Sequence, residues 1–173
     1  MKFITLFFAL LMPLMSLAQD APSSVRKNIV APNLVGEADL KFFGLKVYHI
    51  SLWGEDKNFS YEKKFAIHIR YNMNFSKEEM AKRSIEEIER LHQLSDDERS
   101  SYYQKLEGIF SAVKKGDEKT AIFTPNHGVA LFYNGEISGI ISDEKLARFF
   151  VDIWLDERGS YPKVTRKILG KNY

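Results

Sequence analysis

Apolar and polar residues alternate along several short stretches of the chain, which is the pattern of β-strands with one buried face. Residues 65–71 give the clearest case, because phenylalanine, two isoleucines and tyrosine alternate there with Ala66, His68 and Arg70. Residues 45–53 are rich in β-formers and carry apolar groups on both faces, so we expect a central strand that is covered on two sides. The remaining predicted strands are residues 38–43, 120–124, 128–133 and 136–141.

A different period, with apolar residues three or four positions apart, predicts helices between and after these strands. Two helices begin with a capping box, in which a serine is followed three residues later by a glutamate: Ser76 with Glu79, and Ser95 with Glu98. The second of them is expected to continue to Gly116, a typical helix-terminating residue. Further helices are predicted for residues 143–155, capped by Ser142 or Asp143, and for residues 162–170, which start with a proline.

Turn signals decide how these elements are connected. Asn134-Gly135 stands between two predicted strands and is the strongest two-residue hairpin signal, because both residues tolerate positive φ. Gly44 is expected to form a similar bend. Strands therefore occur in hairpin-linked groups, in the order βββ-αα-βββ-αα. This order predicts an α+β fold, a large, mainly antiparallel sheet with a layer of helices on one face.

The two ends of the sequence differ from this pattern. Residues 1–18 are typical of a cleaved signal peptide, with Lys2 before an apolar run and small residues at Ser16 and Ala18. Residues 19–32 have the composition of a flexible lead-in, and residues 33–173 are expected to form a single domain. No second apolar run is long enough to span a bilayer, so we expect a periplasmic or secreted protein that is not an integral membrane protein after cleavage.

Composition excludes several kinds of chemistry. The chain has no cysteine, which excludes thiol catalysis and thiolate metal sites, and its four histidines lack metal-binding spacing, so neither a metal nor another cofactor is expected. Removal of Lys2 with the signal peptide lowers the formal net charge from +2 to +1. Basic residues are interleaved with acidic ones, so nucleic acid is not an expected partner.

Arg70 is the leading candidate for a binding residue, because a guanidinium on a central strand can grip a carboxylate against apolar walls. The alternative is a solvated sheet face or a salt bridge. His68, Tyr48 and Tyr71 are secondary candidates for ligand contacts. Lys82 lies in a predicted helix whose charges are usually exposed, where nearby glutamates can pair with it.

Residues 35–53, the Asn134-Gly135 hairpin and the helix that follows it resemble those of bacterial chalcone isomerase-like proteins. The resemblance covers residues 33–170 and implies an open-faced sandwich with a cleft between sheet and helices. The plant enzymes of this fold use an arginine, a threonine, a tyrosine, a lysine and an asparagine. The positions that match them here are Gly36, Tyr48, Glu79, Lys82 and Glu86, so most of the catalytic set is missing.

Three functions follow from this comparison. The leading hypothesis is a non-catalytic periplasmic protein that binds a lipophilic acidic small molecule such as a fatty acid, as plastid relatives do, with Arg70 as the anchor. The second is a chalcone isomerase-type intramolecular lyase that uses Tyr48 and Lys82. The third is a structural or partner-binding protein whose cleft is filled by its own side chains.

Overall fold

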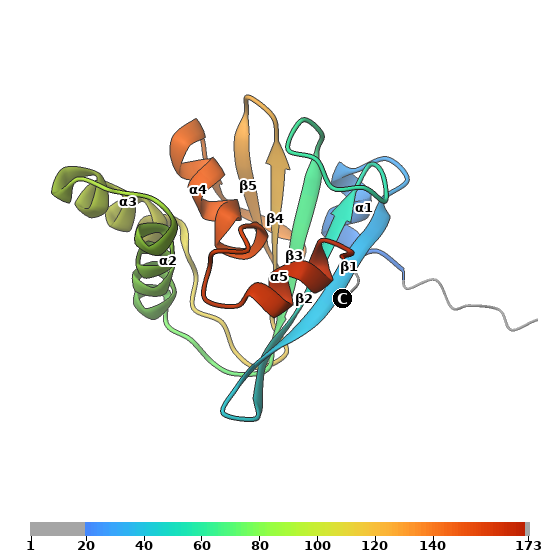
Figure 1. Cartoon of the computed structure of the whole chain (residues 1–173), viewed down its shortest axis with the longest axis horizontal. Helices are drawn as coiled ribbons and strands as arrows, with labels where there is room; N and C mark the ends of the chain where they lie inside the picture. Colours follow the sequence, from blue (N-terminus) through green and yellow to red (C-terminus); the bar gives the residue numbers. More distant parts are fainter. Residues whose placement is uncertain (1–19, 172–173) are drawn as a thin grey trace, which may run out of the picture.

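A computed structural model describes residues 20–171, and within this range the chain forms one six-stranded sheet and five helices (Figure 1). The strands follow each other across the sheet in chain order, and every neighbouring pair is antiparallel. The strands are β1 (Asn33–Phe42), β2 (Leu45–Gly54), β3 (Phe65–Tyr71), β4 (Glu118–Thr124), β5 (Gly128–Tyr133) and β6 (Glu136–Ile141). The predicted α+β class and antiparallel sheet are confirmed.

Four helices lie on one side of this sheet. Helix α4 packs against β4, β5 and β6, α5 packs against β1 and β2, and α2 contacts α3 and α4 (Figure 1). Their bounds are α2 (Lys77–Leu91), α3 (Asp96–Ile109), α4 (Glu144–Leu155) and α5 (Pro162–Ile168). Because α2 rests on other helices, it stands apart from the sheet and leaves space beneath it.

Local sequence signals account for most of the element boundaries. Both predicted capping boxes form, at the N-termini of α2 and α3, and Asp143 caps α4. Asn134 and Gly135 have φ values of 48° and 91°, as the predicted hairpin turn requires. Helix α3, however, ends at Ile109 rather than near Gly116, because the backbone of Val113 instead exchanges two hydrogen bonds with Phe75.

The expected flexible lead-in requires correction. Residues Ser23–Asn28 form helix α1, which covers the other face of the sheet. Val25 is fully buried, and it forms a second core with Trp53 and Ala66. A helix therefore occupies each side of the central strands, in line with the apolar groups predicted on both faces of residues 45–53.

The predicted signal peptide, residues 1–18, lies outside the described residues. Among residues 20–171, no helix combines the length and the apolar character needed to cross a bilayer.

Candidate functional site

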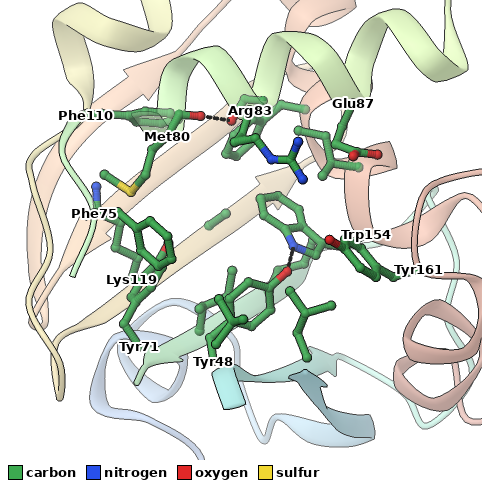
Figure 2. Close-up of a pocket in the computed structure, with 18 of the residues that line it drawn as sticks. Tyr48, Tyr71, Phe75, Met80, Arg83, Glu87, Phe110, Lys119, Trp154 and Tyr161 are labelled. Carbon is green, nitrogen blue, oxygen red and sulfur yellow. Dashed lines mark hydrogen bonds between the residues drawn. The ribbon is translucent and has the colours of Figure 1, made fainter. Parts of the chain in front are cut away.

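A cavity of about 320 Å³ lies between the sheet and helix α2, and it is open to solvent on one side (Figure 2). Most of its wall is apolar. Strand β3 contributes Ile67 and Ile69, β4 contributes Ala121, β5 contributes Leu131, and α4 contributes Phe150. The small alanine and the distance of α2 from the sheet keep this space free of side chains.

The strand alternation predicted for residues 65–71 explains which residues face the cavity. Ile67, Ile69 and Tyr71 point into it, while Ala66 belongs to the core beneath α1. Tyr48 of β2 is the register partner of Tyr71, and the two rings pack edge to face with centroids 6.0 Å apart. The two tyrosine rings therefore form one continuous aromatic part of the cavity wall.

Polar groups gather at one end of the cavity. Trp154 donates a hydrogen bond from Nε1 to the Tyr48 hydroxyl at 3.2 Å, and Arg83 of α2 points toward this pair (Figure 2). Burial raises the pKa of Tyr48 far above its usual value, so the hydroxyl stays protonated and available as a donor. The guanidinium of Arg83 is already bound to Glu86 at 3.0 Å, and its side chain is 62% exposed.

Lys119 lies at another part of the wall and has a different environment. Its ammonium is 5.0 Å from the ring centre of Phe110 and 5.9 Å from that of Tyr133. Among the described residues, no carboxylate lies within ion-pair distance of this ammonium. Burial lowers the pKa of Lys119 to about 8, although Asp117 acts in the opposite direction. The site thus holds a partly desolvated cation that has ring faces as its neighbours.

Two of the predicted ligand-binding residues, Tyr48 and Tyr71, line this cavity, but Arg70 does not. Arg70 alternates with Ile69 and Tyr71 along β3, so its side chain leaves the opposite face of the sheet. There it is 65% exposed and paired with Glu118 at 2.8 Å. The prediction of Arg70 as an anchor inside the cleft is therefore corrected in favour of the salt-bridge alternative.

His68 is also placed on the face beneath α1. Its Nδ1 lies 3.0 Å from the Thr120 hydroxyl, which in turn lies 2.7 Å from the hydroxyl of Ser24. Burial lowers the pKa of His68 to about 4, against the opposing effect of Glu118. The imidazole is thus neutral near pH 7, and it links the sheet to α1 rather than contacting the cavity.

The candidate catalytic residue Lys82 is exposed and lies outside the cavity wall, whereas its neighbour Arg83 is part of that wall. One residue turns a helix by about 100°, which is enough to move a side chain from the wall to the outer surface. Tyr48 remains the single candidate catalytic residue that the structure places at the cavity.

Gly36 and Glu79, which the sequence resemblance matches to catalytic residues of the plant enzymes, have other roles in the structure. A Cβ atom on Gly36 would lie 2.2 Å from the carbonyl oxygen of Lys167, so α5 closes this position to any side chain. Glu79 accepts a hydrogen bond from the Ser76 amide at 2.7 Å, as part of the capping box.

Sequence reasoning missed Arg83 and Lys119 as cavity residues. Lys119 shares a strand face with Ala121, which also lines the cavity, but Thr120 and Ile122 are buried on the opposite face. Apolar and polar residues therefore alternate only weakly along residues 118–124. Nothing in the sequence indicated that Lys119 faces a cavity. Among residues 20–171, no group of three or more metal-ligating side chains is found.

Comparisons with known proteins agree with this architecture. A family model described as chalcone isomerase-like matches residues 33–170. Among solved structures, a fatty-acid binding protein of Arabidopsis thaliana is similar, with a TM-score of 0.61, 12% sequence identity, and coverage of 82% of this chain and 88% of that chain. At this identity, the likeness shows a shared fold. A search of curated proteins finds no match. The family match spans most of the chain, which therefore belongs to the chalcone isomerase-like family.

Proposed function

We propose that the protein is a non-catalytic binding protein for a lipophilic carboxylic acid, such as a fatty acid, and that it acts in the periplasm. The apolar cavity supports the class of ligand, as does the similarity to an Arabidopsis thaliana protein that binds fatty acids. The signal-peptide pattern of residues 1–18 supports the location.

The environment of Lys119 is the observation that carries this proposal. An ammonium that is partly removed from water and has no carboxylate within ion-pair distance gains more from a bound carboxylate than an exposed ammonium does, because the interaction is less screened. Arg83 offers less, since Glu86 already neutralises it and solvent surrounds it. We therefore assign the carboxylate to Lys119, in place of Arg70.

The apolar wall supplies the remaining affinity. About ten buried methylenes contribute on the order of 8 kcal/mol. Association costs about 4–15 kcal/mol, so a hydrocarbon chain alone binds weakly, and the head-group contact decides whether the ligand is retained.

The arrangement of the catalytic positions supports the non-catalytic part of the proposal. Closing a ring through an oxyanion requires preorganised donors, each of which contributes roughly 3 kcal/mol. Here Gly36 is blocked by α5, Lys82 lies outside the cavity, and Glu79 is held in a helix cap. Tyr48 alone does not make such a set.

Displacement of a fluorescent fatty acid tests the assignment. In Lys119→Met, which keeps an unbranched apolar side chain but removes the ammonium, we expect the affinity for a long-chain acid to fall about tenfold, through the loss of one charge-assisted contact. Affinity for the alcohol of the same chain length should stay within about twofold or improve, because it lacks the charge.

Arg70→Met is the matched control, since it removes a cation from the other face of the sheet. It should bind the acid as the wild type does. Equal losses in the two variants, or no loss in Lys119→Met, would reject Lys119 as the anchor. Failure of the wild type to bind any long-chain acid would reject the proposed function itself.

A further inference from the structure

The turn between β1 and β2 carries a group of exposed apolar side chains, which we call the hairpin tip and define as residues 42–45. Phe43 is 91% exposed, Leu45 is 65% exposed and Phe42 is 56% exposed. The tip projects at the lower edge of Figure 1, where it extends beyond the helical layer. Adjacent apolar groups of this size rarely face water on a soluble domain unless they contact something else.

The backbone of the hairpin tip makes this exposure more unusual. Phe43 has a φ of 46°, a left-handed conformation that bulky residues avoid, and Gly44 follows with a φ of 80°. The rings of Phe42 and Phe43 pack edge to face with centroids 4.5 Å apart, which fixes them as a pair. Neither burial nor backbone preference within the chain favours phenylalanine at position 43. The packing of the described residues therefore gives no reason for a phenylalanine at this position.

Basic residues flank the apolar tip and also lie on a second loop at the same edge of the molecule. Lys41 and Lys46 are register partners at the base of the turn, and Lys46 also binds Asp39 at 2.7 Å. Lys114 and Lys115 are exposed on the loop before β4. The backbone amide of Lys115 donates a hydrogen bond to the side-chain oxygen of Asn74 at 2.8 Å, which holds this loop. This loop reaches the same edge of the molecule as the tip (Figure 1).

We propose that the hairpin tip docks on an anionic phospholipid surface. Aromatic rings enter the interfacial region of a bilayer, while lysines beside them stay at the level of the head groups and attract anionic lipids. The combination of exposed phenylalanines with four neighbouring lysines fits this surface better than it fits a protein groove, which would need a defined shape.

The location of the cavity agrees with such docking. Phe42 and Met73 line the cavity wall and are also exposed, so the apolar surface of the tip continues into the cavity. A docked protein would present this side of its cavity to the bilayer. An apolar ligand could then pass between lipid and protein without crossing bulk water.

Cosedimentation with sucrose-loaded vesicles tests this inference directly and needs no ligand. We expect binding to vesicles of phosphatidylcholine mixed with phosphatidylglycerol, and much weaker binding to phosphatidylcholine alone. Phe43→Asn should lower the partition coefficient at least about tenfold, because it removes one large apolar anchor. It creates an Asn-Gly turn like Asn134-Gly135, so the hairpin itself is expected to form well.

Val30→Asn is the matched control, because Val30 is also 91% exposed but lies outside the tip. It should bind as the wild type does. The double variant Lys114→Gln/Lys115→Gln should lose most of the preference for anionic vesicles and its salt dependence. Undiminished binding of Phe43→Asn, an equal loss in Val30→Asn, or no wild-type binding to anionic vesicles would overturn the proposal. Lys119→Met should bind vesicles normally, which separates this test from that of the carboxylate anchor.

Discussion

Lys119 and Arg70 show how one residue's surroundings decide its chemistry. Both are cations on central strands, but Arg70 is solvated and paired with Glu118, whereas Lys119 lies against Phe110 and Tyr133. Desolvation lowers the pKa of Lys119 to about 8, so its charge is lost at a pH at which an exposed lysine keeps it. A bound carboxylate would favour the charged form and raise this pKa again.

Ligand affinity should therefore depend on pH in a defined direction. Because the pKa of Lys119 is about 8 in the empty protein and higher in the complex, affinity should change little near neutral pH, where the ligand is ionised, and should fall above pH 8 by up to about tenfold per pH unit. Titration calorimetry between neutral and alkaline pH measures this, and proton uptake on binding should appear near pH 8.

Lys119→Arg provides the control for this pH dependence. Arginine keeps its charge throughout this range, so the decrease in affinity should disappear. A wild-type affinity that does not change with pH, or an equal decrease in the arginine variant, would contradict the assignment.

Helix α1 is short, but it contributes to the stability of the second core. Its six residues are too few to be stable alone, so the helix depends on the burial of Val25 and Ile29 against the sheet. Hydrogen bonds that join Ser24, Thr120 and His68 fix its position. This helix covers the part of the second sheet face that holds Trp53, while Arg70 on the same face stays exposed.

Shortening one side chain of α1 should destabilise the whole domain. We expect Val25→Ala to lower the free energy of unfolding by about 2 kcal/mol, because the fully buried site loses two methyl groups and gains a cavity. Val30→Ala, at a fully solvated position just after this helix, should change it by less than about 0.5 kcal/mol. Urea denaturation measures both values, and similar effects in the two variants would show that α1 is not docked in solution.

The sequence predicted those elements whose signals are local. Ser76, Ser95 and Asn134 each act through a few neighbouring residues, and all three features form as expected. Helix α1 was missed because Pro22 and the two serines after it resemble a linker, and its formation depends on contacts with strands far along the chain. The end of α3 was also set by a distant partner, Phe75.

At the scale of the whole molecule, helix α5 packs closely against strand β1. Gly36 lets the carbonyl groups of Lys167 and Ile168 approach the strand, since a Cβ atom there would lie 2.2 Å and 2.7 Å from their oxygens. The same contact that holds α5 in place leaves no room for a side chain at Gly36, the position that the sequence resemblance matches to the plant enzymes' arginine. The packing of α5 on β1 thus requires glycine at this position.

Gly36→Ala should therefore be costly for a single methyl group. We expect the free energy of unfolding to fall by about 2–3 kcal/mol, because α5 must move away from the strand. Gly108→Ala is the matched control, since nothing lies within 4 Å of its added Cβ in α3, and it should raise stability by up to about 1 kcal/mol. An unchanged stability of Gly36→Ala in urea denaturation would mean that α5 is loosely held.

The sequence predicted the apolar and aromatic wall of the candidate site, but it did not predict which charged residue lies there. Alternation placed Tyr71, Ile67 and Ile69 on one face, and it also placed Arg70 on the other. Which face carries the cavity depends on where α2 packs, and that is a property of the assembled fold. Lys119 enters the site through the pairing of β3 with β4, which no local pattern specifies.

The two tryptophans of the chain lie on opposite sides of the sheet, Trp154 at the cavity and Trp53 beneath α1. The intrinsic tryptophan fluorescence of the protein can therefore report on what is bound in the cavity. A conjugated polyene acid bound against Tyr48 and Tyr71 would accept excitation energy from the indole of Trp154, which lines the same cavity. Loss of tryptophan emission on addition of such an acid would then measure the proposed binding without a dye attached to the protein.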